Sequence, residues 1–115
     1  MAKHKLFTLN PWIEDDDQGP YYCPACGVVE GFLVYSPEIR EEIEIISVDF
    51  PRPRPLIVEL LGQENQSSPV LVLDDETPMA DGIQQSLSTG KKFINDEIAI
   101  CNFLAATYNG VKPHP

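Results

Sequence analysis

The stretch Tyr22-Cys23-Pro24-Ala25-Cys26-Gly27 places two thiols three positions apart at the predicted start of a helix. Pro24 suits the first helical position, because the N–H that proline lacks would have no helical partner there. This makes Cys23 the N-cap residue and puts Cys26 one turn inside the helix. Free backbone N–H groups and the helix dipole favour a thiolate at Cys23, and the thiolate is the nucleophilic form of cysteine. Cys26 is then placed to attack a mixed disulfide formed at Cys23 and to release the partner.

Two other interpretations of the Cys-x-x-Cys spacing stay open. The same spacing occurs as half of a zinc site and as a pair of unreactive helix thiols. Zinc needs four ligands, and the rest of the chain offers only the scattered residues Cys101, His4 and His114. The predicted strand before the helix favours a redox pair, so we assign no metal ligands. We expect Cys101 to be a packed small hydrophobe and both histidines to lie on mobile surface near the termini.

The composition is that of an acidic chain of one domain's length. Its 115 residues include 18 acidic and 8 basic ones, which gives a net charge of -10. We therefore expect residues 1–115 to form a single domain that repels nucleic-acid phosphates and anionic membrane surfaces. Because we recognise neither a signal peptide nor an apolar run long enough to span a membrane, we expect a reducing, cytoplasmic location.

Strands and helices alternate through the first half of the sequence. Residues 5–9 predict a central strand, and a long polar link joins it to a helix expected over 24–35. The nearly continuous apolar segment 44–50 predicts a strand that is parallel to the first and covered on both faces. Three prolines in 51–55 lead to a short helix that Gly62 ends.

The second half of the sequence has weaker patterns. Residues 69–73 predict a strand, and 91–94 predict a short one. Asn95 is expected to cap a final helix over 96–108, whereas 74–90 show no period and predict no element. The apolar face of the final helix is expected to consist of Ile98, Cys101, Leu104 and Tyr108.

This order of elements resembles the thioredoxin fold. Ser68-Pro69-Val70-Leu71 resembles the segment where that superfamily carries a cis-proline beside the active thiol. Residues 93–104 resemble the helix after the last strand in the amino-terminal domains of glutathione transferases. Residues 22–26, 48–55 and 64–69 together look like one uncharacterised, thioredoxin-like bacterial family. The resemblance spans nearly the whole chain and implies an α/β fold of order β-α-β-α-β-β-α, with a mixed four-stranded sheet flanked by helices.

The residues and the resemblance together predict a glutaredoxin-like thiol-disulfide oxidoreductase. In this hypothesis Cys23 is the nucleophile and Cys26 resolves the mixed disulfide. Tyr22, Ser68 and Pro69 border the substrate groove, and a cis peptide between Ser68 and Pro69 turns the Ser68 backbone toward an extended substrate. The expected substrate is a small thiol or a protein disulfide. No resident cofactor is expected, although glutathione is a candidate co-substrate.

Two departures from the resembled families predict that glutathione binds weakly. Ala25 stands where glutaredoxins usually carry tyrosine, and Glu97 follows Asp96 where the transferase pattern has serine. Asp96 is expected near the amino end of glutathione, but Glu97 would repel its carboxylate. Arg52 and Arg54 are the expected compensating cations, because guanidinium binds carboxylate bidentately.

Two rival functions come from other classes. The first is a non-catalytic binding module of thioredoxin fold, whose groove holds a peptide or a small anion. The second is thiol-dependent reduction of an anion, which the two arginines of an otherwise acidic chain suggest. Turnover of a disulfide substrate separates the oxidoreductase from the binding module.

Overall fold

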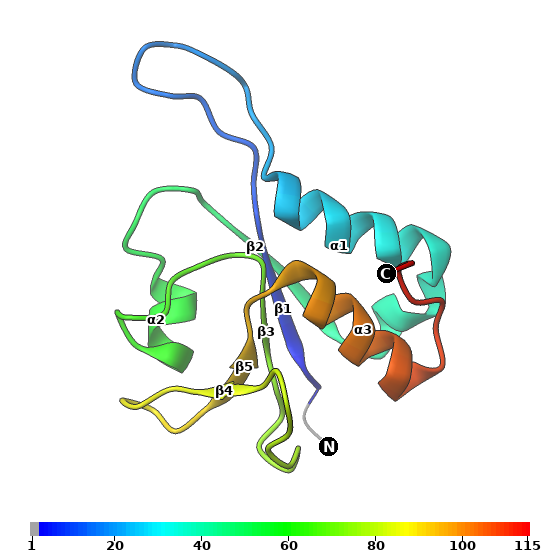
Figure 1. Cartoon of the computed structure of the whole chain (residues 1–115). Coiled ribbons are helices and arrows are strands. Elements are labelled where there is room, and N and C mark those ends of the chain that lie inside the picture. Colours follow the sequence, from blue (N-terminus) through cyan, green and yellow to red (C-terminus); the bar gives the residue numbers. More distant parts are fainter. Residues whose placement is uncertain (1–2) are drawn as a thin grey trace.

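The computed structural model describes residues 3–115 and contains both helices and strands. None of the helices in this range is both long and apolar enough to cross a membrane. Figure 1 labels the elements, and helices packed on a mixed sheet make this a mixed α/β protein, as the sequence predicts. In chain order they are β1 (Lys5–Leu9), α1 (Pro24–Tyr35), the 3-10 helix η1 (Pro37–Glu41), β2 (Glu44–Val48), α2 (Pro55–Leu61), β3 (Val70–Val72), β4 (Gln84–Gln85), β5 (Lys92–Ile94) and α3 (Glu97–Tyr108).

The sheet has five strands within the described residues, in the order β2-β1-β3-β5-β4. β1 and β2 are parallel, whereas the other three neighbouring pairs are antiparallel. The prediction of four strands was therefore wrong, because β4 adds a fifth strand at one edge. Its residues Gln84 and Gln85 are polar and exposed, so no apolar period marks them. Backbone pairing with Lys92 and Phe93 defines this strand instead.

β1 is central, as predicted, and β2 packs against a core on each face but is covered only in part. β2 lies at an edge of the sheet and pairs only with β1. Val48 is the one buried residue of β2, whereas Ile45 and Ile46 are half-buried. The apolar run therefore predicted correctly a strand parallel to β1 with apolar contacts on both faces. The coverage is incomplete, because an edge strand keeps part of each face open to water.

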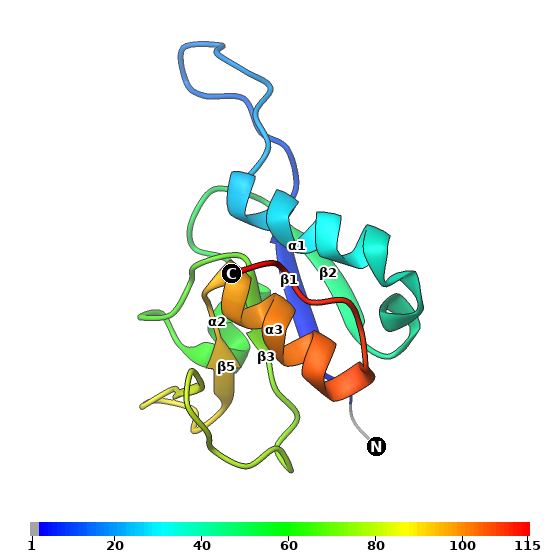
Figure 2. The same cartoon turned by 45° about the vertical axis from the view of Figure 1, so that its right-hand side comes forward.

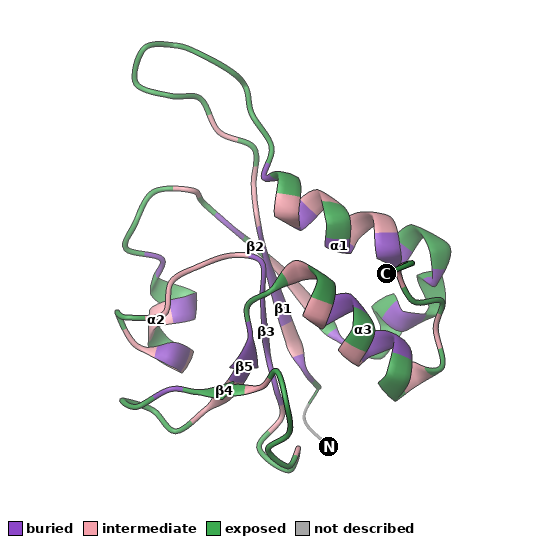
Figure 3. Cartoon of the chain, in the orientation of Figure 1, coloured by how far each residue is buried: buried purple, intermediate pink, exposed green. Residues whose placement is uncertain are grey.

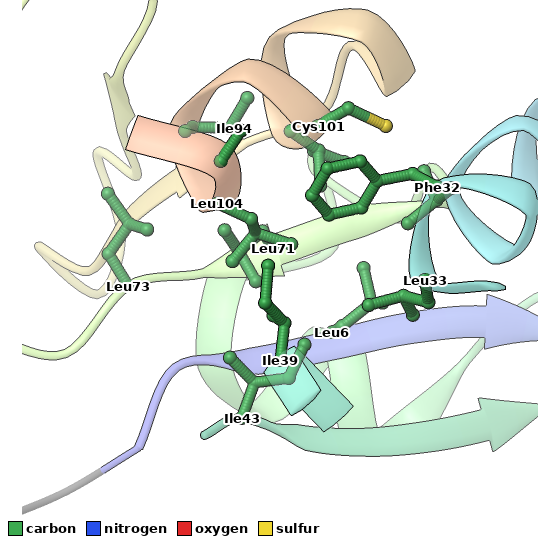
Figure 4. Close-up of a cluster of buried hydrophobic side chains, with 13 residues drawn as sticks. Leu6, Phe32, Leu33, Ile39, Ile43, Leu71, Leu73, Ile94, Cys101 and Leu104 are labelled. Carbon is green, nitrogen blue, oxygen red and sulfur yellow. The ribbon is translucent and has the colours of Figure 1, made fainter. Parts of the chain in front are cut away.

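Successive side chains of the central strands enter two different cores. Leu6 and Leu71 point to the face covered by α1 and α3, and Phe7 and Val70 point to the face covered by α2. Figures 1 and 2 show the helices on these two sides of the sheet. Burial in Figure 3 is concentrated along the sheet and the helix faces that pack on it. Figure 4 shows the larger core, which includes Leu6, Phe32, Leu33, Ile39, Ile43, Leu71, Leu73, Ile94, Cys101 and Leu104.

α3 begins at Glu97, one residue later than predicted, and ends at Tyr108 as predicted. Asp96, not Asn95, is the N-cap, and its carboxylate accepts the Ala99 N–H at 2.9 Å. A carboxylate satisfies a free N–H and also favours the positive end of the helix dipole. Ile98 is 45% exposed, so the predicted apolar face was partly wrong. The buried residues of α3 are Ile100, Cys101, Leu104 and Ala105.

The link between β1 and α1 forms a protruding arm, residues 10–22, beside the start of α1 (Figure 1). Trp12 and Tyr21 close its base by exchanging two backbone hydrogen bonds, of 3.0 and 2.8 Å. Backbone hydrogen bonds between Glu14 and Gln18 and between Asp17 and Glu14 form the turn at its tip. The arm thus brings an aromatic pair next to the Cys-x-x-Cys segment.

Candidate functional site

Cys23 is the N-cap residue of α1, as predicted. Its backbone is extended, with φ -74 and ψ 114, and its sulfur accepts the Cys26 N–H at 3.1 Å. Pro24 occupies the first turn, and the Gly27 N–H donates to the Cys23 carbonyl at 3.0 Å. The sulfur therefore takes the place that a serine or aspartate oxygen takes in most helix caps. A negative charge on that sulfur is stabilised by the N–H group and by the helix dipole.

Cys26 lies deeper than Cys23 and has a different electrostatic environment. It is 5% exposed, and burial raises its pKa to about 11. A hydrogen bond with Cys23 acts in the same direction, whereas contacts with the Leu9 backbone and the Ser68 side chain oppose it. Cys26 is therefore a neutral thiol at pH 7. Both residues are free cysteines, so the structure describes the reduced pair.

Ser68 connects both sulfurs to the central strand. The Cys23 thiol lies 3.9 Å from the Ser68 carbonyl oxygen, and the Cys26 sulfur lies 3.8 Å from the Ser68 hydroxyl. That hydroxyl donates to the Phe7 carbonyl of β1 at 3.0 Å. The peptide bond between Ser68 and Pro69 is cis, which confirms the prediction for this bond. Two further cis bonds, which were not predicted, precede Pro20 and Pro53.

Arg54 is buried, and its guanidinium donates to backbone carbonyls. Its side chain donates to the Phe50 carbonyl at 3.0 and 2.6 Å and to the Gln66 carbonyl at 2.7 Å. Its backbone N–H also donates to the Gln66 side chain at 2.8 Å. These bonds occupy the guanidinium that was predicted to bind a substrate carboxylate. Arg52, by contrast, is exposed on the same loop.

Arg54 also lies within electrostatic reach of the thiols. Burial lowers its pKa, and the charge of Arg52 acts in the same direction. Cys23 and Cys26 oppose this shift, because a thiolate stabilises a nearby cation. The interaction is reciprocal, so the guanidinium stabilises a thiolate at the site. Arg54 thus adds a positive charge within electrostatic reach of the thiols, although it is not among the causes of the raised pKa of Cys26.

Three aromatic residues that pack together at the base of the arm, Trp12, Tyr21 and Phe50, were not singled out from the sequence. Trp12, at the base of the arm, stacks on Phe50 with 4.2 Å between ring centroids and 11° between ring planes. Arg54 lies over the same Phe50 ring at 5.6 Å, and Tyr21 lies 6.3 Å from Trp12. The indole N–H of Trp12 is buried without a hydrogen-bond partner among residues 3–115. In the sequence, Trp12 and Tyr21 stand on either side of the acidic run 14–17, and Phe50 directly precedes the proline-rich segment 51–55.

Tyr22 and Asp96 occupy different surroundings. Tyr22 is 71% exposed, and its ring passes so close to Gly27 that a Cβ there would lie 3.3 Å from it. Tyr22 therefore covers the first turn of α1. Asp96 caps α3, and no hydrogen bond joins it to Cys23 or Ser68 within residues 3–115. In the same range no group of three or more His, Cys, Asp or Glu side chains is placed to hold a metal ion.

These features define the chain as a mixed α/β protein with a Cys-x-x-Cys pair at a helix N-terminus, packed against an X-Pro segment. The chain belongs to the family DUF3088, described as protein of unknown function, which matches residues 3–112. This agrees with the predicted membership in an uncharacterised family. No curated protein matches the chain, and no solved structure does.

Proposed function

We propose that this protein is a thiol-disulfide oxidoreductase of glutaredoxin-like type, with Cys23 as nucleophile and Cys26 as resolving thiol. The observation that carries the proposal is the 3.1 Å hydrogen bond from the Cys26 N–H to the Cys23 sulfur at the start of α1. Backbone N–H groups at a helix start stabilise the thiolate, which is the attacking form. The buried charge of Arg54 acts in the same direction.

The arrangement of the strands supports a thioredoxin-like fold for the same protein. Four neighbouring strands, β2-β1-β3-β5, have the parallel pair on one side and antiparallel pairs on the other. α1 begins after β1, and Pro69 opens β3 beside the thiols. In this proposal β4 is an addition at the edge of the sheet, next to β5.

The first chemical step forms a mixed disulfide between Cys23 and the substrate. The Cys23 thiolate attacks one sulfur of the substrate, a new S–S bond forms, and the substrate S–S bond breaks. The departing sulfur leaves as a thiolate and takes a proton from water. The Ser68 carbonyl, 3.9 Å from the Cys23 sulfur, is available to pair with an N–H of an extended substrate.

The second step is intramolecular and releases the reduced substrate. Cys26 gives its proton to water and attacks the Cys23 sulfur, so that a Cys23–Cys26 bond forms and the mixed disulfide breaks. The bound half of the substrate leaves as a thiolate and takes up a proton from water. Two electrons pass from the cysteine pair to the substrate. The raised pKa of Cys26, about 11, makes its deprotonation the demanding part of this step. Two thiol equivalents, from a small thiol or a protein dithiol, restore the reduced pair.

Glutathione is proposed as a weak co-substrate. Its carboxylates need cations, but backbone carbonyls already occupy the Arg54 guanidinium. Glu97 follows the capping residue Asp96, and the chain carries a net charge of -10. Arg52 is exposed and suited to bind a carboxylate. A protein disulfide with a neutral or basic flank fits this surface better than an acidic tripeptide does.

The burial of both thiols favours one rival function, a binding module without turnover. Cys23 is 8% exposed and Cys26 is 5% exposed. In that alternative the thiols pack, and the surface beside Ser68 binds a peptide or small anion. A thiolate attacks a disulfide along a single line, so a small exposed area at the Cys23 sulfur is enough for the reaction. The small area restricts which disulfides can approach.

Reduction of insulin or of a small mixed disulfide tests the proposal. We expect turnover by the wild type, none by Cys23→Ser, and wild-type rates from Cys101→Ala, which removes a thiol outside the site. Wild-type protein that is folded but gives no turnover with either substrate, in the presence of a thiol donor, would overturn the oxidoreductase and support the binding module.

A further inference from the structure

A cavity of about 680 Å³ opens at the end of the sheet opposite the thiols. His4 precedes β1 and Asp74 follows β3, and the register of these antiparallel strands places Lys5 opposite Val72. Ser68, beside the thiols, precedes β3 at its other end. The cavity is therefore separate from the proposed redox site. Its volume lies within the roughly 300 to 1,000 Å³ of small-molecule sites.

The walls of the cavity are apolar and come from three segments. Ile83 belongs to the loop after β3, Ile94 to β5, and Ala99 and Phe103 to α3 (Figure 1). The Phe103 ring meets the His4 ring edge-on, with 5.4 Å between centroids and 73° between planes. Such walls favour an apolar ligand body, and an aromatic face attracts a cation.

The rim of the cavity is acidic. Asp74, Glu76 and Asp81 line it, and neither lysine nor arginine is among the described residues that do. Glu76 and Asp81 are exposed and form no ion pair within residues 3–115. In a chain of net charge -10 this rim repels anions and attracts cations.

His4 supplies a buried polar group at the cavity, contrary to its predicted place on mobile surface. It is 7% exposed, and its Nδ1 accepts the Asp74 N–H at 3.0 Å. Burial lowers the pKa of His4, although Asp74 opposes the shift, so the ring is neutral at pH 7. A neutral ring that accepts at Nδ1 carries its proton at Nε2. No hydrogen bond within residues 3–115 uses that Nε2–H.

We propose that this cavity binds a small organic ammonium compound that has an apolar body and a neutral oxygen acceptor. Glu76 and Asp81 attract the ammonium group at the rim. Ile83 and Phe103 contact the apolar body, and the His4 Nε2–H donates to the oxygen. The three features act on different parts of one ligand, so each can be tested by changing the ligand or the protein.

Tyramine contains all three features and serves as the probe. We expect it to shift amide signals of the 74–83 loop and of α3 in ¹H-¹⁵N spectra of the full chain, with a Kd of about 1 mM. Phenethylamine, which lacks the oxygen, should bind about fivefold more weakly because it cannot use the His4 donor. 3-(4-Hydroxyphenyl)propionate has the same body with an anionic end, and at about 10 mM it should cause no shifts in these segments.

Two variants test the protein side. The double variant Glu76→Gln, Asp81→Asn should weaken tyramine binding about tenfold, because both rim charges are lost. Glu38→Gln, Glu41→Gln removes the same charge from the exposed η1 helix and should leave the Kd unchanged. His4→Phe keeps an aromatic ring against Phe103 and should reduce tyramine affinity to that of phenethylamine. If His4→Phe unfolds, the rim variant and the ligand comparison still decide.

Three results would each overturn the proposal. The first is an absence of localised shifts with tyramine at about 10 mM, where a millimolar site would be largely occupied. The second is equal binding of the anionic and cationic probes. The third is an equal loss of affinity in the rim variant and the η1 control, which would mean that net charge alone attracts the amine.

Discussion

The two long helices of this protein have matched geometry and different chemistry at their N-termini. α1 and α3 are both 12 residues long, and in each the N-cap side chain accepts the N–H of the residue three positions later. The acceptor is the Cys23 sulfur in α1, at 3.1 Å, and the Asp96 carboxylate in α3, at 2.9 Å. Aspartate is among the preferred caps and cysteine is not. A cysteine at this position therefore indicates chemistry more than helix stability.

The surroundings of the two caps reinforce this difference. The cap of α1 has Ser68 beside it and the buried cation Arg54 within electrostatic reach. The first turn of α3 contains the acidic residue Glu97 instead. Positive charge near a sulfur stabilises the thiolate, whereas negative charge in the first turn stabilises only the helix. These surroundings support the proposal that the N-terminus of α1 holds a reactive thiolate.

The largest expected effect comes from replacing the sulfur cap by an oxygen cap. Cys23→Ser should lower disulfide reductase activity at least about a thousandfold, because serine is not a nucleophile toward disulfides at neutral pH. Its free energy of unfolding should stay within about 1 kcal/mol of wild type or rise, since serine is a preferred N-cap. Activity assays and urea unfolding of the same sample measure both. Retained activity would contradict the assignment of Cys23.

The next largest effect concerns Arg54, a buried cation that acts on the N-terminus of α1, whereas the first turn of α3 contains the acidic residue Glu97. Both Arg54→Lys and Arg54→Met should lose about 2 to 4 kcal/mol of stability, because each leaves the buried Phe50 and Gln66 carbonyls short of donors. Only Arg54→Met removes the positive charge. The rate of alkylation of Cys23 at pH 7 should therefore fall in Arg54→Met and remain near wild type in Arg54→Lys. Equal rates in all three proteins would show that the helix terminus alone activates the thiol.

The buried thiol of Cys101 on α3 makes the free energy of unfolding depend on pH in the alkaline range. Burial, helped by the charge of Glu97, raises the pKa of Cys101 from 9.0 to about 11. The folded state thus binds this proton more tightly than the unfolded chain does. Its stabilising contribution is complete below about pH 9 and is lost as the pH rises toward 11, a change of about 2 to 3 kcal/mol.

Comparison with Cys101→Ala isolates this effect from other groups that titrate at alkaline pH. The variant is expected to be less stable at pH 7, because a buried sulfur is removed, but to lose less stability between pH 8.5 and 10.5. Chemical unfolding at a series of pH values measures the two slopes. Parallel slopes would contradict the contribution of Cys101.

The smallest effect separates the observed role of Asp96 as the cap of α3 from its predicted role in binding the amino group of glutathione. Asp96→Ala removes the cap and should cost about 1 kcal/mol, whereas Asp96→Asn keeps a capping oxygen and should cost only a few tenths. If Asp96 only caps α3, both variants bind glutathione as the wild type does. If its carboxylate also holds the ammonium group, Asp96→Asn should weaken binding several-fold by titration calorimetry without a matching loss of stability.

Local signals in the sequence were enough to predict most of the fold. α1 was predicted with its observed bounds, because Pro24 suits its start and Ser36-Pro37 ends it. β4 was missed because Gln84 and Gln85 carry no apolar pattern and are held by hydrogen bonds of the backbone and of both side chains. Both Asn95 and Asp96 are good caps, and the sequence alone does not rank them.

The candidate site could be predicted where neighbours in sequence form it or where the resemblance supplies a distant residue. The cap role of Cys23 follows from the local Cys-Pro-x-Cys pattern, and its neighbour Ser68 was placed by resemblance. The burial of Arg54 depends on two carbonyls that converge from Phe50 and Gln66. The burial of His4 depends on Asp74 and Phe103, about 70 and 100 residues away along the chain. Such long-range contacts leave no periodic trace in a single sequence.

Trapping the mixed disulfide is the most direct measurement of the central claim, that Cys23 attacks and Cys26 resolves. Cys26→Ser, incubated with oxidised glutathione or a disulfide-bonded peptide, should accumulate one covalent adduct at Cys23 by intact and peptide mass spectrometry. The wild type should instead form a Cys23–Cys26 disulfide, and Cys23→Ser should form no adduct at this pair. An adduct on Cys26 in the wild type, or unmodified Cys23 in Cys26→Ser under the same conditions, would contradict the account.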